Sequence, residues 1–313
     1  MSTLFRATWT SRGSVLIPLT VRAVRGGLWI YGSIRASGLL ANRATGRLAA
    51  IGTRWVPGTK VVWTPSIDNA DFADWVAHTS DSLEKQIQAW VVQLPSDRRR
   101  RRFNLLLLDE RHTPVAFAKF TSNPLNPIGL EAMARFARQP AETFWAPQLV
   151  TYGQLSGHSF VVTSPMPNRP HLPALLDAEG RRRILSEIQI RLADLASPET
   201  LVHGDFAPWN VRRLRGGSVA VVDWEEATRG EVAADELWYL VTVNAARRGN
   251  SARILKGILT ESRYTRVEVS AAAEFWLRRL DRPEADEVDQ ELSLATKAEA
   301  YARRIRSLLA SVV

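Results

Sequence analysis

The segment from His203 to Asn210 constrains this chain more than any other part of its sequence. A short apolar run leads into Asp205, and the carboxamide of Asn210 follows five residues later. Apolar residues that give way to polar residues and a proline are typical of a strand that ends in a tight loop. The sequence therefore predicts one loop that presents both the Asp205 carboxylate and the Asn210 amide.

A second carboxylate follows this loop at Asp223. Two short apolar stretches, 211–214 and 218–222, flank the pair Gly216-Gly217. Such an arrangement predicts a β-hairpin with a glycine turn. The hairpin would deliver Asp223 to the same site.

This order of groups suits phosphoryl transfer from a nucleotide. In that reaction one carboxylate orients the attacking hydroxyl, while an amide oxygen and another carboxylate hold the magnesium ion that offsets the phosphate charge. Asp205 is the candidate catalytic residue, and Asn210 and Asp223 are the candidate Mg²⁺ ligands. The alternative is that these residues serve only the chemistry of a turn.

The same residues resemble the His-Gly-Asp box of the aminoglycoside phosphotransferase and choline kinase relatives of protein kinases. The resemblance covers residues 88–240 and implies a two-lobed protein-kinase-like fold of the α+β class. We expect His203 to hold the loop by hydrogen bonding, with a role as general base as the alternative, and Trp209 to pack beneath the loop. Asp235 resembles a family position that braces the lobe. The resemblance also implies ATP or GTP as the nucleotide and Mg²⁺ as the cofactor.

Hydrophobic patterning predicts two parts of different character. Residues 1–163 are rich in expected strands and form the predicted nucleotide-binding lobe with an N-terminal extension, and residues 164–313 form the predicted catalytic and substrate-binding lobe. We expect short strands or irregular structure in residues 1–70, and a helix from Phe72 that is interrupted near Thr79. The remaining predicted strands are 88–94, 103–108, 114–120 and 160–163, and the remaining predicted helices are 130–137, one capped by Asp177, 231–248 and 294–312.

Two residues are candidates for binding the nucleotide phosphates. Lys119 lies in an alternating strand pattern and resembles the third-strand lysine of kinases, and Glu131 is its expected ion-pair partner. Only five of the 41 basic residues are lysines, so a lysine in a strand indicates a need for a compact ammonium group. The alternative is a lysine that protects an edge strand from aggregation.

The expected phosphate-covering loop departs from the family pattern. Residues 95–102 contain Ser96, a further candidate for nucleotide binding, and the arginine run Arg98–Arg102, but no glycine. The arginines could grip phosphate by bidentate hydrogen bonds, or they could form a solvated basic turn or a site for another anion. Thr163 and Met166 are placed by position at the expected adenine hinge.

Composition limits the remaining functions. The chain contains no cysteine, so disulfides and thiolate metal sites are excluded. No signal-peptide pattern or membrane-length apolar run occurs, so a soluble cytoplasmic protein is expected. The net charge of +9 comes from the first half, yet no nucleic-acid-binding signature accompanies it, so neither nucleic acid nor a membrane is an expected partner.

The function predicted from the sequence is therefore a kinase of a small hydroxyl-bearing molecule such as an aminoglycoside, an amino alcohol or a sugar. The alternative is a nucleotide-binding module without phosphotransferase activity, which the loop without glycine favours. A nucleic-acid or membrane-surface binder has the least support.

Overall fold

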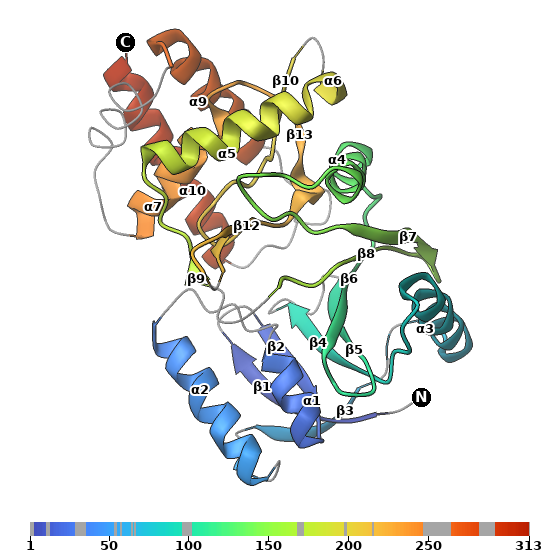
Figure 1. Cartoon of the computed structure of the whole chain (residues 1–313). Helices are drawn as coiled ribbons and strands as arrows, with labels where there is room; N and C mark the ends of the chain where they lie inside the picture. Colours follow the sequence, from blue (N-terminus) through green and yellow to red (C-terminus); the bar gives the residue numbers. More distant parts are fainter. Residues whose placement is uncertain are drawn as a thin grey trace. The chain divides into compact units, whose positions relative to one another are not determined.

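A computed structural model describes most of the chain. The described residues are 3–10, 13–28, 36–52, 55–56, 58–63, 65, 67–95, 102–167, 172–196, 199–214, 216–246, 264–281 and 292–312. They divide into two compact units (Figure 1). The strand-rich unit comprises Met1–Leu125 with Pro147–Leu172, and the helical unit comprises Asn126–Ala146 with Pro173–Val313. The predicted α+β class, with a strand-rich part and a mainly helical part, is confirmed.

The strand-rich unit contains one antiparallel sheet. Within the described residues it has eight strands in the order β3-β1-β2-β4-β5-β6-β8-β7. The predicted strands at 88–94, 103–108, 114–120 and 160–163 are confirmed. Each observed end lies within two residues of the predicted end. The strands are β1 (Thr3–Thr10), β2 (Gly13–Pro18), β3 (Thr59–Trp63), β4 (Ala89–Pro95), β5 (Phe103–Leu108), β6 (Pro114–Thr121), β7 (Leu149–Leu155) and β8 (His158–Thr163).

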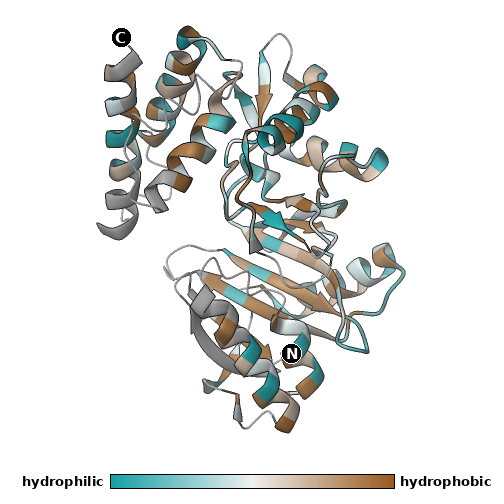
Figure 2. Ribbon diagram, turned by 60° about the vertical axis from the view of Figure 1, so that its left-hand side comes forward, coloured by the Kyte–Doolittle hydropathy of each residue, from teal (hydrophilic) through white to brown (hydrophobic). Residues whose placement is uncertain are grey.

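Aromatic side chains fill the core on one face of this sheet. Phe103 stacks on Phe120 with ring centroids 4.6 Å apart, and Trp75 meets Phe120 edge to face at 4.9 Å. Offset stacking and edge-to-face contact are the preferred geometries of aromatic pairs. Apolar colouring dominates the sheet strands in Figure 2, which is expected of a sheet whose strands are largely buried.

The helix α3 (Asn69–Leu83) corrects one prediction from the sequence. It runs without interruption through Thr79, whose side chain is fully buried beside the aromatic core. The helix ends instead at Glu84, which adopts a left-handed conformation with φ of 51°. The apolar residues beyond Glu84 therefore lead into β4 and do not continue the helix.

The N-terminal region also differs from expectation, because it contains helices as well as strands. These are α1 (Val21–Gly27) and α2 (Ala36–Ile51). Thr20 caps α1 by accepting a hydrogen bond from the Ala23 amide at 3.1 Å. The expectation of short strands or irregular structure in residues 1–70 is therefore wrong for these two helices.

The helical unit contains short strands and the longest of the described helices. The predicted hairpin is confirmed as β11 and β12, and Asp177 caps α5 as expected. The helix expected from residue 231 begins at Ala234, and its predicted end at 248 lies outside the described residues. The elements are α4 (Pro127–Arg138), β9 (Leu172–Pro173), α5 (Ala178–Arg191), α6 (Ala193–Ala196), β10 (Thr200–Val202), β11 (Val211–Arg213), β12 (Val219–Val221), the 3-10 helix η3 (Trp224–Glu226), β13 (Thr228–Gly230), α7 (Ala234–Ala246), α9 (Arg266–Leu280) and α10 (Leu292–Val312).

Helices α7, α9 and α10 pack together around a second apolar core (Figure 1). Trp276 of α9 and Ile305 of α10 are buried in it, and Trp238 of α7 is 7% exposed. This core supports the loop that follows β10, because Val202 and Ala207 also belong to it. No helix in the part of the chain that the structure describes is long and apolar enough to span a membrane.

Candidate active site in the helical unit

The loop after β10 is fastened by a buried carboxylate. Asp235, near the start of α7, accepts a hydrogen bond from the His203 amide at 2.6 Å and another from the Gly204 amide at 3.1 Å. Asp235 is 4% exposed, and loss of hydration on burial raises its pKa to about 7. Asp235 therefore braces the loop, as the resemblance implied.

The His203 ring joins the loop to the hairpin. Its Nδ1 accepts a hydrogen bond from the Asp205 amide at 3.3 Å, so we assign the ring proton to Nε2, which lies 3.0 Å from the Val222 carbonyl oxygen. The ring also packs against Trp224 with centroids 4.6 Å apart. Since both ring nitrogens serve the loop, the structural role expected of His203 is confirmed.

Gly204 allows the loop to approach the 3-10 helix closely. Its φ of 77° lies in the left-handed region, and a Cβ added there would overlap the Glu226 carbonyl oxygen. Both the left-handed backbone conformation and the close Glu226 carbonyl oxygen therefore require glycine at this position of the His-Gly-Asp sequence.

Three side chains donate hydrogen bonds to the Asp205 carboxylate. Asn210 Nδ2 lies 2.7 Å from Oδ2, and Trp209 Nε1 lies 3.1 Å from the same oxygen. Trp238 Nε1 lies 2.9 Å from Oδ1. The structure thus brings Asp205 and Asn210 into direct contact, which the sequence predicted only as membership of one loop.

Burial and neighbouring charge determine the acidity of Asp205. Loss of hydration is the largest effect and raises its pKa to about 6, and the negative charges of Asp223 and Glu226 act in the same direction. The indole donors of Trp238 and Trp209 oppose this shift because they favour the ionised form. Asp223 is therefore close enough to Asp205 for their charges to interact, as the hairpin prediction required.

The backbone at Asp223 is strained. Asp223 has φ of 69° and ψ of 55°, a left-handed conformation that is uncommon for residues with a side chain. Such strain is found preferentially at functional sites. Although Asp223 precedes the 3-10 helix η3, its side chain makes no capping hydrogen bond to that helix.

The donor atoms at Asn210 and Asp223 suit Mg²⁺. Asn210 uses its amide nitrogen to donate to the Asp205 carbonyl and carboxylate, which leaves the amide oxygen as the atom that could bind a cation. Amide and carboxylate oxygens are the ligands that Mg²⁺ prefers, with water and phosphate oxygens completing its shell. Among the described residues, no group of three or more His, Cys, Asp or Glu side chains is arranged to hold a metal on its own.

The candidate nucleotide-binding residues Lys119, Thr163 and Met166 lie in the strand-rich unit. Lys119 is half-buried on β6, with Nζ 6.0 Å from the centre of the Phe117 ring. Because β6 lies between β5 and β8, the alternative of an edge-strand lysine is wrong.

The other candidates on this side are less distinctive. Thr163 is buried and its hydroxyl lies 3.4 Å from the Phe117 carbonyl oxygen, while Met166 is half-buried in a segment without regular structure. Ser96, Asp97 and the first four residues of the arginine run, Arg98–Arg101, lie outside the described residues.

Glu131, the expected partner of Lys119, has cationic partners on its own helix. Its Oε1 accepts from Arg138 Nη2 at 2.8 Å and from Arg135 Nε at 3.3 Å. Residues four and seven positions apart lie on one face of a helix, so both arginines can reach Glu131. The Lys119–Glu131 pair joins residues of different units and stays a prediction.

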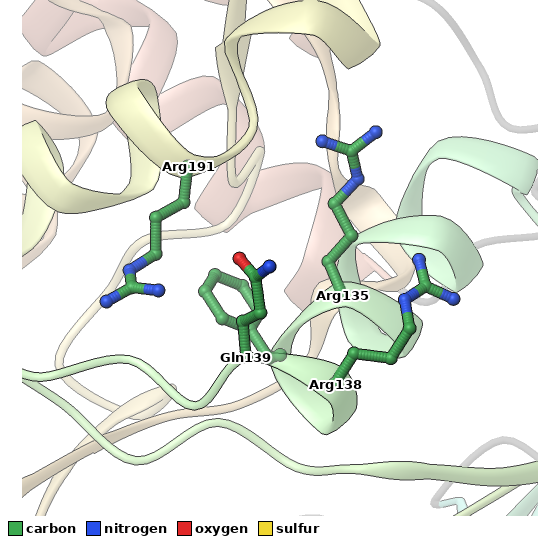
Figure 3. Close-up of a pocket in the computed structure, with 5 residues that line it drawn as sticks. Arg135, Arg138, Gln139 and Arg191 are labelled. Atoms are coloured by element: carbon green, nitrogen blue, oxygen red, sulfur yellow. The ribbon is translucent and has the colours of Figure 1, made fainter.

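A separate pocket of about 190 Å³ lies at the end of α4 (Figure 3). It is lined by Arg135, Phe136, Arg138, Gln139 and Arg191, none of which is a predicted site residue. The arginines are engaged by carboxylates: Arg135 forms a bidentate pair with Asp194, and Arg191 contacts Glu187 and Glu142. An anion entering this pocket would have to displace these carboxylates.

Two functional contacts were missed by reasoning from the sequence. Trp209 was expected to pack beneath the loop, but its indole N–H donates to Asp205. For Trp238 the sequence offered one signal, because it follows the expected bracing Asp235 by three residues on an apolar helix. Its donation spans 33 residues, which no local pattern reports.

Comparison with known proteins gives one family match. Residues 167–276 match the model of the phosphotransferase enzyme family, APH. No curated protein sequence matches the chain.

Solved structures give distant similarities. Aminoglycoside phosphotransferase APH(4)-Ia is 11% identical with a TM-score of 0.49, over 78% of this chain and 99% of that chain. A thermostable mutant of that enzyme, in a ternary complex with ADP and hygromycin B, is 11% identical with a TM-score of 0.48, over 75% and 98%. The GDP complex of an aminoglycoside 2'-phosphotransferase-IIIa mutant is 10% identical with a TM-score of 0.44, over 78% and 97%. Identities and scores this low transfer no substrate to this chain.

Proposed function

Since residues 167–276 match the phosphotransferase enzyme family and so confirm the resemblance read from the sequence, we propose that this chain transfers the γ-phosphate of ATP or GTP to a hydroxyl group of a small molecule. The acceptor class is the one that the sequence suggested, namely an aminoglycoside-like compound, an amino alcohol or a sugar. Asp205 is the proposed catalytic residue, and Asn210 and Asp223 are the proposed metal ligands.

The observation that carries this proposal is the arrangement around Asp205. Its carboxylate is held by Asn210 at 2.7 Å and lies within electrostatic reach of Asp223. In phosphoryl transfer the transition state is loose, so a carboxylate that orients the acceptor hydroxyl contributes mainly by positioning. Asp205 would accept a hydrogen bond from that hydroxyl and take its proton late in the transfer.

The metal ligands have a role that fits their placement. Mg²⁺ bound by Asn210 and Asp223 would offset the charge of the nucleotide phosphates. The Asn210 amide group donates to Asp205 and would bind the cation through its oxygen, so the residue would couple the position of the carboxylate to that of the metal. Lys119 is proposed to contact the phosphates, and Thr163, Met166 and Ser96 are proposed to lie near the nucleotide.

A catalytically silent nucleotide-binding module is the second candidate, because residues 95–102 contain no glycine. Thermal-shift titration with Mg·ATP and Mg·GTP tests what both candidates share. Stabilisation is expected, since a ligand that binds only the folded state raises the unfolding temperature. No stabilisation at millimolar nucleotide would contradict both candidates.

Turnover separates the two candidates. ADP or GDP formation would be measured across a panel of hydroxyl compounds, with Asp205→Asn as the test variant and Asp194→Asn as the control, since Asp194 lies on α6 and pairs with Arg135. The phosphotransferase proposal expects acceptor-dependent turnover that Asp205→Asn abolishes and Asp194→Asn retains. Equal turnover by the wild type and Asp205→Asn would contradict the assignment of Asp205.

A further inference from the structure

The Asp205 carboxylate is held unevenly by its three side-chain donors. Oδ2 accepts from two of them, Asn210 Nδ2 at 2.7 Å and Trp209 Nε1 at 3.1 Å. Oδ1 accepts from one, Trp238 Nε1 at 2.9 Å. The two oxygens of this carboxylate are therefore chemically different in the folded protein.

Counting acceptor sites shows which oxygen can take a further donor. Each oxygen of an ionised carboxylate has about two lone-pair sites for hydrogen bonds. On Oδ2 both sites are used by Asn210 and Trp209, whereas on Oδ1 the described residues use one site, for Trp238, and leave the other. An incoming hydroxyl group would thus meet its acceptor at Oδ1.

We propose that Trp209 and Trp238 are positioning residues, whose indole N–H groups orient the Asp205 carboxylate so that Oδ1 receives the acceptor hydroxyl and its proton. This inference rests on the proposed function of the site. An indole N–H is a donor only, so both tryptophans favour the carboxylate orientation that points its oxygens at them. In the transfer, the acceptor oxygen bonds to the γ-phosphorus while the bond from that phosphorus to the bridging oxygen breaks and the nucleoside diphosphate leaves. The O–H bond of the acceptor breaks as well, and Oδ1 takes the proton.

The surroundings of Trp238 fix the direction of its N–H group. Its ring stacks on Trp276 with centroids 4.3 Å apart and planes 15° from parallel, and it meets the edge of Tyr301 at 5.2 Å. Aromatic contacts of this kind leave a ring little freedom to turn. Helices α9 and α10 thus contribute to the position of Asp205 indirectly, through their contacts with Trp238.

Other tryptophans of the helical unit show what a purely structural indole does. Trp276 donates to the Ala234 carbonyl oxygen at 2.7 Å, and Trp224 donates to the Val221 carbonyl oxygen at 3.1 Å. Both satisfy backbone groups, as most buried side-chain donors do. Trp209 and Trp238 instead converge on one carboxylate from different elements, a loop and α7.

The first test compares single tryptophan variants in steady-state turnover. Trp238→Phe and Trp209→Phe each remove one N–H donor and keep an aromatic ring. Trp75→Phe is the control, because Trp75 is a buried tryptophan in the aromatic core of the strand-rich unit. We expect kcat to fall about tenfold in each test variant, the scale of one lost hydrogen bond to a charged group. The KM for Mg·ATP should stay within about twofold, and the control should keep its kcat within about threefold.

The second test reads the hydrogen bonds without turnover. Indole N–H signals in a ¹H–¹⁵N spectrum of the full chain would be assigned with the three variants and compared with those of Asp205→Ala. The signals of Trp209 and Trp238 should move upfield when their carboxylate acceptor is removed, and the Trp75 signal should stay in place. If Trp238→Phe fails to fold, the movement of the Trp209 signal in Asp205→Ala, assigned with Trp209→Phe, still tests the positioning role.

The outcomes distinguish this inference from the proposed function. If the wild type turns over an acceptor while Trp238→Phe and Trp209→Phe keep wild-type kcat, the positioning role is wrong and the phosphotransferase proposal stands. The same holds if neither indole signal moves in Asp205→Ala. If the indole signals move but the wild type transfers phosphate to no acceptor, the proposed function fails, and the positioning role fails with it.

Discussion

Two acidic side chains of the helical unit lose part of their hydration on folding. Asp205 and Asp235 both have raised pKa values, to about 6 and about 7, because burial disfavours their charged forms. Backbone and indole N–H groups compensate in part by donating to the carboxylates. The loop is thus held in place by interactions that are themselves sensitive to substitution.

The raised pKa of Asp235 predicts a pH-dependent stability. Between the ordinary pKa of 3.8 and the folded value of about 7, the folded protein binds a proton that the unfolded chain has lost. Stability therefore falls as pH rises through this window. The free energy of unfolding in urea, measured at about pH 5 and about pH 8, should fall less in Asp235→Asn than in the wild type.

Asp281→Asn is the control, since it removes the same charge at an exposed position where α9 ends. Its change in stability between the two pH values should equal that of the wild type. A wild-type slope retained in Asp235→Asn would contradict the assignment to Asp235.

A second prediction concerns Gly204. In Gly204→Ala the added Cβ would overlap the Glu226 carbonyl oxygen at a backbone φ of 77°, so the loop or the 3-10 helix must shift. We expect a loss of about 3 kcal/mol in the free energy of unfolding. Gly216→Ala is the matched control, with φ of 90° and no atom within 4 Å, and should cost only about 1 kcal/mol. Equal losses in the two variants would show that the contact with Glu226 is unimportant.

At the scale of elements, α4 is tied to the 3-10 helix that follows Asp223. Asn126 caps α4 by accepting from the Ile128 amide at 3.1 Å, and its amide nitrogen donates to the carbonyl oxygens of Glu225 and Ala227 at 2.9 and 2.5 Å. One side chain thus begins a helix and holds the segment beside a proposed metal ligand.

The prediction for this element separates the two roles of Asn126. Asn126→Asp keeps the capping oxygen but turns a carboxylate oxygen toward two carbonyl oxygens, so we expect a loss of about 2 kcal/mol in urea unfolding. Asp177→Asn is the control. Asp177 caps α5 by accepting from the Gly180 amide at 2.8 Å, and asparagine keeps an oxygen that can accept this hydrogen bond. This substitution should cost only a few tenths of a kcal/mol. Similar losses at both caps would contradict the donor role of Asn126.

Local patterns predicted most of the elements that position the site. Alternation in β6 and the glycine turn of the hairpin are properties of consecutive residues, and both were confirmed. The break expected near Thr79 was wrong because burial of that residue against the aromatic core outweighs its modest helix propensity. The helices α1 and α2 were missed because their sequences carry weak periodicity.

The site itself was predictable only as far as it is local. Asp205, Asn210 and Asp223 belong to one loop and hairpin, so their spacing indicated their association. The donation from Trp238 depends on how α7 packs, and the arginines at Glu131 depend on helix geometry. Contacts between distant elements arise from tertiary packing, which patterns in a single sequence do not encode.

At the scale of the whole molecule, the chain consists of a strand-rich unit with Lys119 and a helical unit with Asp205, Asn210 and Asp223. The net charge of +9 is compatible with an anionic nucleotide as ligand. We therefore predict that the full chain performs phosphate transfer that depends on Asp205 and on the proposed metal ligands of the helical unit.

The most direct test follows the γ-phosphate itself by ³¹P NMR, with Mg·ATP, the full chain and a mixture of hydroxyl-bearing metabolites. The proposed function predicts a new phosphate-monoester signal that grows as ATP is consumed and that is absent for Asp205→Asn. Consumption of ATP to inorganic phosphate alone, or a monoester signal of equal size with Asp205→Asn, would contradict it.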